Sequence, residues 1–167
     1  MTSGECWANF QEISAPQSSH LSPIADPFHG LPHRPPFVFV RAIRAIEAGR
    51  SADCETSFEP GDAMFRGHFP GNPLVPGVLL TEALAQTAGI AAASGYPMGE
   101  KPMFLLSGIR SMKFLRPVRP GEQIHLRAEK LAEVDGLIQL AVKATVNQQP
   151  VAQGHLVLSI APTVQCI

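Results

Sequence analysis

A histidine and a glutamate stand fourteen residues apart, on either side of a segment rich in proline and glycine. His68 leads this segment, and Glu82 follows it in an apolar stretch. A neutral imidazole near pH 7 is a competent base, and a protonated carboxyl group is a competent acid. The constrained backbone between them would fix their positions, so the pattern indicates a site for acid and base catalysis. The alternative for His68 is an ordinary turn histidine at the surface.

Glu82 is expected to be buried or nearly so. It is flanked by apolar residues such as Leu80, Ala83 and Leu84, and unpaired buried carboxylates are costly and rare. Burial favours the protonated form of a carboxyl group, which makes Glu82 a candidate general acid. The alternative is a structural glutamate hydrogen-bonded to a neighbouring strand. Gln86, one helical turn further on the same face, could hold Glu82 or the loop in place, or could be a buried amide with its own partners.

The start of the predicted helix is the third element of the site. Pro76 is favoured at the first helical position, but no Ser, Thr, Asp or Asn directly precedes it to cap the helix. The first backbone N–H groups, at Gly77 and Val78, are therefore left without an obvious partner. They could donate to a substrate oxygen, since Gly77 has no side chain to shield them. The alternative is that Gly77 only permits close packing.

A base, an acid and an oxyanion donor together fit the elimination of water from an acyl thioester. A carbonyl bound at the Gly77 N–H would have an acidified α-proton, which His68 could remove. Glu82 would protonate the hydroxyl that leaves the β-carbon. This chemistry needs no cofactor, and the sequence offers neither a metal-ligand spacing nor a phosphate-binding glycine pattern.

One helix and about six strands must position these residues. The helix is predicted from Pro76 to about Ser94, where Gly95 ends it. Alternating apolar residues and turn residues predict strands at 37–47, 53–59, 103–115, 121–133, 137–146 and 151–161. Turns are expected at Ala48-Gly49, Asp135-Gly136 and Gln149-Pro150. The pattern predicts an α+β fold in which a mostly antiparallel sheet curves around one buried central helix.

Composition indicates one domain with a short extension. A chain of 167 residues that is 45% hydrophobic can bury one substantial core. Residues 1–30 are rich in Ser, Pro and His and are predicted to form a flexible or loosely docked N-terminal extension, before a domain at 31–167. Charged residues make up only 16% of the chain, which predicts that a second subunit covers part of the surface.

Charge, cysteine spacing and hydropathy exclude several classes of function. The net charge of −1 argues against general nucleic-acid binding. Cys6, Cys54 and Cys166 form neither a disulfide framework nor a metal spacing, which fits a reducing compartment. Glu82 and Gln86 interrupt the longest apolar stretch, so a membrane span is not expected. The first thirty residues lack the layout of a signal peptide, and a cytoplasmic location is predicted.

The run GHFPGNPLVPGVLLTEALAQ, preceded by LPHRPPF and followed by GIRSMKFLRPVRPGEQI, resembles the FabZ-type (3R)-3-hydroxyacyl-[acyl carrier protein] dehydratases. The resemblance covers about residues 31–161. It implies a hotdog fold and a homodimer, commonly assembled into a trimer of dimers with each active site shared across the dimer interface. By motif position, it implies that His68 and Glu82 are the catalytic pair, contributed by opposite subunits. Gly77 matches the donor to the thioester carbonyl. Glu rather than Asp at position 82 resembles the FabZ type and not the isomerising FabA type.

Three positions depart from the family pattern. Arg41-Ala42 replaces the usual Asp-Arg, and Arg110 replaces the aspartate of the GID segment. Leu105 stands where the family often has a tyrosine associated with gating of the acyl tunnel. The catalytic pair is intact while the tunnel and its rim differ, so a specialised pathway, such as that of a secondary metabolite or a polyene, is an alternative to primary fatty acid synthesis.

Four basic residues lie close together after the helix: Arg110, Lys113, Arg116 and Arg119. An acyl carrier protein is acidic, so a basic rim at the tunnel mouth would steer it and its phosphopantetheine arm. Lys113 and Arg116 are the predicted contacts. The alternative is a solvated charged edge.

Two other functions remain open on the sequence. A hotdog thioesterase would use an acid or base to activate water, whereas the spacing of His68 and Glu82 favours elimination. A non-catalytic subunit that binds acyl carrier protein would be expected to lose one of the two residues, and this chain retains both.

Overall fold

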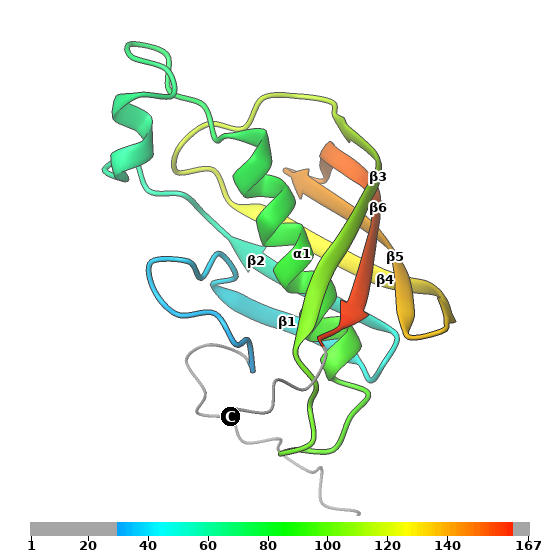
Figure 1. Ribbon diagram of the computed structural model, residues 1–167. Coiled ribbons are helices and arrows are strands. Elements are labelled where there is room, and N and C mark those ends of the chain that lie inside the picture. Colours follow the sequence, from blue (N-terminus) through cyan, green and yellow to red (C-terminus); the bar gives the residue numbers. More distant parts are fainter. Residues whose placement is uncertain (1–29, 162–167) are drawn as a thin grey trace, which may run out of the picture.

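One antiparallel sheet of six strands curves around one long helix, as predicted (Figure 1). The computed structural model describes residues 30–161. The helix α1 spans Gly77–Ala93, and a short 3₁₀ helix, η1, spans Ala63–Arg66. The strands are β1 (Ala42–Glu47), β2 (Ser51–Thr56), β3 (Phe104–Phe114), β4 (Ile124–Val134), β5 (Leu137–Val146) and β6 (Gln149–Ile160). Their order in the sheet is β1-β2-β4-β5-β6-β3.

The helix α1 is buried because its sequence is apolar on nearly every side. Figure 1 shows it lying across one face of the sheet, where it packs mainly against β4, β2 and β5. Pro76 precedes the first turn with φ −58°, and Glu82 is the helix's one charged residue. At the other end, Gly95 meets the β1–β2 turn so closely that a Cβ there would lie 2.9 Å from the Cα of Gly49. The predicted helix is thus confirmed to within one residue at each end.

The strand predictions are confirmed in number and differ in their ends. Strand β5 matches its prediction. Residues 37–41 are not strand, because Gln86 takes the backbone groups of Phe37 and Phe39 that a neighbouring strand would otherwise bind. The turn predicted at Gln149-Pro150 is wrong as well. Asn147 and Gln148, with φ of 49° and 64°, make a tight hairpin turn instead, so β6 begins two residues earlier than predicted.

Strand β3 is an edge strand with an apolar surface. Within residues 30–161 it pairs only with β6, which leaves its other edge unpaired. Leu105, Leu106, Ile109 and Phe114, all on this strand, are between 40% and 54% exposed. An exposed apolar edge of this length is a template for pairing with another chain.

The described part of the chain offers neither a bilayer-spanning helix nor a metal site. Among residues 30–161, no helix has the length and hydropathy needed to cross a bilayer. No group of three or more His, Cys, Asp or Glu side chains gathers in the same range. The predicted extension at 1–30 lies almost wholly outside the described residues and remains a prediction.

Candidate active site

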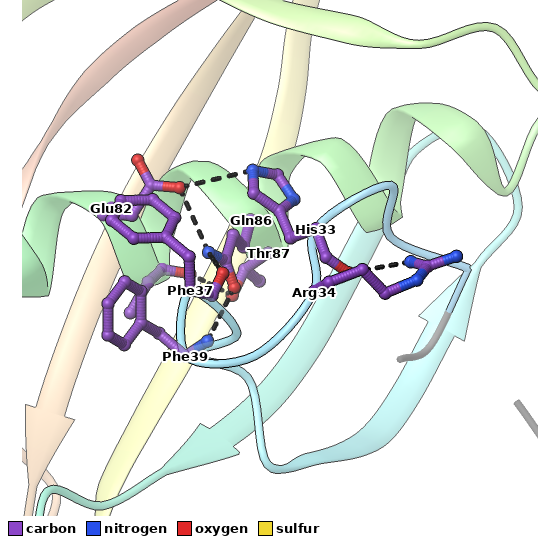
Figure 2. Close-up of polar contacts among 8 residues, drawn as sticks. His33, Arg34, Phe37, Phe39, Glu82, Gln86 and Thr87 are labelled. Atoms are coloured by element: carbon purple, nitrogen blue, oxygen red, sulfur yellow. Dashed lines mark hydrogen bonds and ion pairs between the residues drawn. The ribbon is translucent and has the colours of Figure 1, made fainter. Parts of the chain in front are cut away.

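Glu82 is held in place by a hydrogen-bonded glutamine one turn further along α1. Gln86 Nε2 donates to Glu82 Oε1 at 3.1 Å and to the carbonyl of Phe37 at 3.1 Å. Its Oε1 accepts from the backbone N–H of Phe39 at 2.8 Å (Figure 2). Gln86 is 1% exposed, so it is a fully buried amide whose donor and acceptor groups are both used. It contacts both Glu82 and the segment that leads into the sheet.

Glu82 itself is less buried than its neighbours in sequence suggested. Its side chain is 23% exposed in the single chain. The expectation of an almost fully buried carboxylate is therefore wrong for the isolated chain, because α1 turns Glu82 towards a cavity and not into the core. A half-buried carboxylate at a cavity wall is open to a bound molecule.

The cavity beside Glu82 has a volume of about 170 Å³. One wall is a stripe of α1 that runs from Glu82 past Gly89 to Ala93. The other walls come from residues 30–33, from 102–106 and from Leu158. Leu105 is part of this wall. The lining is largely apolar, which suits a hydrocarbon chain.

His33 is a cavity residue that the sequence analysis did not single out as a site residue. Its Nε2 lies 3.6 Å from Glu82 Oε1, and both residues line the cavity. No local signal pointed to this contact, because the two residues are 49 positions apart in the chain. Only the docking of the entry segment against α1 brings them together.

His68 lies in the loop that follows η1, with its ring fixed by the backbone. Its Nδ1 lies 3.0 Å from the carbonyl oxygen of Leu74. The imidazole ring stacks on the ring of Phe69, with the ring centroids 4.0 Å apart. Because a carbonyl only accepts hydrogen bonds, Nδ1 must carry the proton in the neutral ring. The lone pair of that ring is then on Nε2, which is the atom a base would use.

The structure does not bring His68 and Glu82 together within one chain. His68 is absent from the lining of the cavity beside Glu82. No hydrogen bond or ion pair joins the two side chains in residues 30–161.

The first turn of α1 has no side-chain cap, and two of its backbone donors lack a partner among the described residues. Pro76 gives no side-chain cap, and the first N–H of this region with a backbone partner is that of Leu79, which donates to Pro76 O at 3.0 Å. Within the described residues, the N–H groups of Gly77 and Val78 have no hydrogen-bond acceptor. A Cβ on Gly77 would lie 3.0 Å from the ring of Phe114, so the glycine is also needed for close packing. Both interpretations of Gly77 thus fit the geometry.

The predicted carrier-protein contacts are exposed. Lys113 lies on β3, and Arg116 follows that strand and donates to Gln149 Oε1 at 2.7 Å. Arg119 donates to Asn72 Oδ1 at 3.1 Å, which places it against the loop that carries His68. Within residues 30–161, Lys113, Arg116 and Arg119 make no ion pair, so their charges are available to an acidic partner.

Comparison with known families gives matches over most of the chain. A family model described as ApeI-like, the ApeI dehydratase, matches residues 44–155. The 3-hydroxyacyl-[acyl-carrier-protein] dehydratase FabZ of Acetivibrio thermocellus is 39% identical over 135 residues, which cover 80% of this chain and 90% of that protein. FabZ of Syntrophotalea carbinolica is 39% identical over 137 residues, 81% of this chain and 92% of that protein.

Solved structures with low sequence identity share the fold. The dehydratase heterocomplex ApeI:P from Xenorhabdus doucetiae matches with a TM-score of 0.67 at 15% identity, over 81% of this chain and 90% of that one. The PaaI protein of the E. coli phenylacetic acid degradation operon matches with a TM-score of 0.57 at 17% identity, over 72% of this chain and 78% of that one. These likenesses support the hotdog fold.

Proposed function

Because this chain belongs to the family of FabZ-type dehydratases and is thus an enzyme of the hydro-lyase class, we propose that it converts a (3R)-3-hydroxyacyl-[acyl carrier protein] to the trans-2-enoyl form. The observation that carries the proposal is the position of Glu82, which Gln86 fixes at the wall of an apolar cavity. The carboxyl group can donate the proton in the acid step, and the apolar cavity can hold the hydrocarbon chain of the substrate.

In the proposed reaction His68 is the base and Glu82 the acid. His68 Nε2 takes a proton from the α-carbon, and the electron pair of that C–H bond forms the double bond to the β-carbon. The β-carbon–oxygen bond breaks, and the leaving hydroxyl takes the proton of Glu82 to become water. The products are enoyl thioester, water, imidazolium and carboxylate, and proton exchange with solvent restores the starting forms.

The thioester carbonyl would bind at the start of α1. The N–H groups of Gly77 and Val78 have no partner within the described residues, and they sit at the positive end of the helix dipole. Donors of this kind stabilise the negative charge that develops on the carbonyl oxygen when the α-proton leaves. Gln86 would position the acid and would not itself transfer a proton.

The complete site would be shared between two copies of the chain. His68 and Glu82 do not meet within one chain, and β3 exposes an apolar edge that a second β3 could pair with. We propose a homodimer with two such sites, which can assemble further into a trimer of dimers. The acyl chain would occupy the cavity that runs from Glu82 towards Ala93.

The acidic carrier protein would dock at the basic rim, with Lys113 and Arg116 as its main contacts. Both side chains are exposed, and neither forms an ion pair within residues 30–161. Charge attraction would raise the rate of encounter and orient the phosphopantetheine arm. The cytoplasmic location expected from the cysteine spacing remains part of this proposal.

The testing experiment is a direct assay with 3-hydroxyacyl carrier protein thioesters of several chain lengths, read by mass. Loss of one water, abolished by His68→Ala, is the expected result. Hydrolysis to a free acid would instead support the thioesterase function. Acyl carrier protein that binds and stays unchanged would support a non-catalytic subunit. The profile of chain lengths would separate primary fatty acid synthesis from a specialised pathway.

A further inference from the structure

We propose that His33 is a positioning residue for Glu82, and that its Nε2–H stabilises the carboxylate formed when Glu82 gives up its proton. The proposal rests on the function proposed above, in which Glu82 is the acid. It assigns a role to a residue outside the pair that the family motif names.

The geometry places His33 against one particular oxygen of Glu82. His33 Nε2 lies 3.6 Å from Oε1, the same oxygen that accepts from Gln86 Nε2 at 3.1 Å (Figure 2). Oε2 has no hydrogen bond within residues 30–161. Two donors thus converge on Oε1, which leaves Oε2 as the oxygen that would carry the transferred proton.

The surroundings of the ring assign the proton of a neutral His33 to Nε2. Its Nδ1 is buried and has no hydrogen-bond partner among the described residues. Nε2 faces a carboxylate oxygen, which is a hydrogen-bond acceptor, whereas Nδ1 faces no acceptor among the described residues. The ring is therefore a donor towards Glu82.

The backbone of His33 is fixed, so the ring is held near Glu82. The Arg34 guanidinium donates to the carbonyls of Leu31 at 3.0 Å and His33 at 2.8 Å, which closes a tight loop. The imidazole lies nearly parallel to the ring of Phe37, at a centroid distance of 6.2 Å and an angle of 24°. Phe37 is in turn bound to Gln86 through its carbonyl. One connected set of contacts thus orients both donors to Oε1.

At 3.6 Å, His33 Nε2 and Glu82 Oε1 are too far apart for a hydrogen bond, so the proposed contact has to shorten during turnover. Catalytic contacts often tighten only when substrate is bound. A hydrogen bond to a charged group is also stronger than one to a neutral group. The contact would therefore gain most as Glu82 becomes negative, which lowers the barrier to turnover more than it improves substrate binding.

The test compares His33→Phe and His33→Gln with the unchanged protein, as full chains, on a 3-hydroxyacyl carrier protein thioester. Phenylalanine keeps a planar ring and removes the donor, whereas glutamine keeps an N–H donor. His125→Phe is the matched control, because His125 is exposed and lies on β4 outside the cavity. Circular dichroism and light scattering check the fold and the oligomer of each variant.

We expect His33→Phe to lower kcat about 10- to 100-fold, the effect of one hydrogen bond to a charged group. KM should stay within about 2-fold of the unchanged protein, because ground-state binding is not affected. His33→Gln should recover most of the lost kcat, and His125→Phe should be fully active. If His33→Phe does not fold, His33→Ala replaces it, since it also lacks the donor.

An unchanged kcat in His33→Phe would overturn the proposal. A second result would also overturn it: KM rises by the same factor in His33→Phe and His33→Gln while kcat stays unchanged. His33 would then only shape the cavity. Failure of the underlying function is distinguishable from both results. In that case the unchanged protein eliminates no water, or Glu82→Gln is as active as the unchanged protein.

Discussion

Gln86 donates to Glu82 Oε1 at 3.1 Å while its own Oε1 accepts from the N–H of Phe39 at 2.8 Å. A single buried amide thus ties the proposed acid to the segment that leads into the sheet. The same segment carries His33. The orientation of Glu82 therefore depends on how residues 31–39 dock against α1 as much as on the helix itself.

Glu82→Gln should keep the fold and oligomer and remove most of the turnover. The amide has nearly the shape of the acid but has no proton to transfer, and loss of a general acid costs about 100-fold or more in rate. The measurement is kcat for dehydration, beside thermal unfolding. Glu47→Gln, a change of an exposed glutamate on β1, is the matched control and should be fully active. Normal activity in Glu82→Gln would show that Glu82 is structural.

His68→Ala and Glu82→Gln should complement each other in a mixed dimer. Each variant alone is expected to be inactive and still to bind acyl chains. If the site is shared, a dimer of one His68→Ala copy and one Glu82→Gln copy contains one intact site, so purified mixed dimers should regain about half the wild-type activity. Two affinity tags allow the mixed dimer to be isolated. A mixed dimer as inactive as its parents would place both residues in the same subunit's site.

Gly89→Val should shift the enzyme towards shorter acyl chains. Gly89 lines the cavity, and a Cβ at this position meets no atom within 4 Å, so the added side chain would project into the open space. We expect kcat/KM to fall about 10-fold or more for long substrates and to change little for short ones. The added valine side chain would occupy space that a long acyl chain needs. A chain-length series measures this.

Two controls separate this effect from loss of the fold. Gly89→Ala should raise helix stability by about 1 kcal/mol, since alanine is favoured over glycine inside helices, with a weaker shift in chain length. Gly61→Val places the same side chain at an exposed turn where a Cβ also meets nothing, and it should leave the length profile unchanged. An unaltered profile in Gly89→Val would mean that the acyl chain lies elsewhere.

The double variant Lys113→Ala, Arg116→Ala should weaken the use of carrier-protein substrates. Removal of two exposed positive charges lowers steering of an acidic partner, so KM for the carrier-protein thioester should rise about 10-fold at low salt and less at high salt. A short acyl thioester that is not attached to the carrier protein should keep its wild-type kcat and KM. Arg50→Ala, at the β1–β2 turn, is the control and should not change KM. Equal KM values at all salt concentrations would show that the rim is only a solvated edge.

Glu55→Gln should make the protein less sensitive to acid. A hydrogen bond from Arg44 lowers the pKa of Glu55 below its ordinary value, against the effect of burial, and the charges of Arg44 and His125 lower it further. The folded state thus binds this proton less readily than the unfolded state, so the stabilisation is complete above the ordinary pKa and is lost as the pH falls through the lowered one. Urea unfolding at several pH values measures it.

The variant should be less stable than the wild type near neutral pH, with a flatter loss of stability on acidification. Glu47→Gln, at an exposed position, should follow the wild-type curve. A wild-type pH dependence in Glu55→Gln would show that other groups govern acid unfolding.

Most of the fold could be predicted because its signals are local. The apolar run after Pro76 defined α1, and alternating residues with Asp135-Gly136 at the turn defined β4 and β5. The course of residues 37–39 could not be predicted, since the carbonyl of Phe37 and the N–H of Phe39 bind Gln86, almost fifty residues away. A hydrogen bond between a side chain and a backbone group so far apart in the sequence does not change the pattern of apolar residues, so the sequence does not reveal it.

The proposed site was predictable only in part, for the same reason. His68, Gly77 and Glu82 lie in one continuous motif, so their types and spacing are visible in the sequence. His33 is in the entry segment, and its contact with Glu82 exists only after folding. The exposure of Glu82 depends on the cavity, which is formed by four separate parts of the chain and has no local signature.

The two-residue turn between β4 and β5 offers a place to modify the protein. Asp135 and Gly136 are exposed, and nearby Glu133 lines a cavity with Ala92 at the C-terminal end of α1. Gly77 is at the opposite end of the helix, about 24 Å away at 1.5 Å per residue. Exposed turns of this kind accept insertions. A fluorophore or short peptide placed there would therefore lie far from the proposed carbonyl-binding donors at Gly77 and nearer to the far end of the acyl cavity, which reaches Ala93.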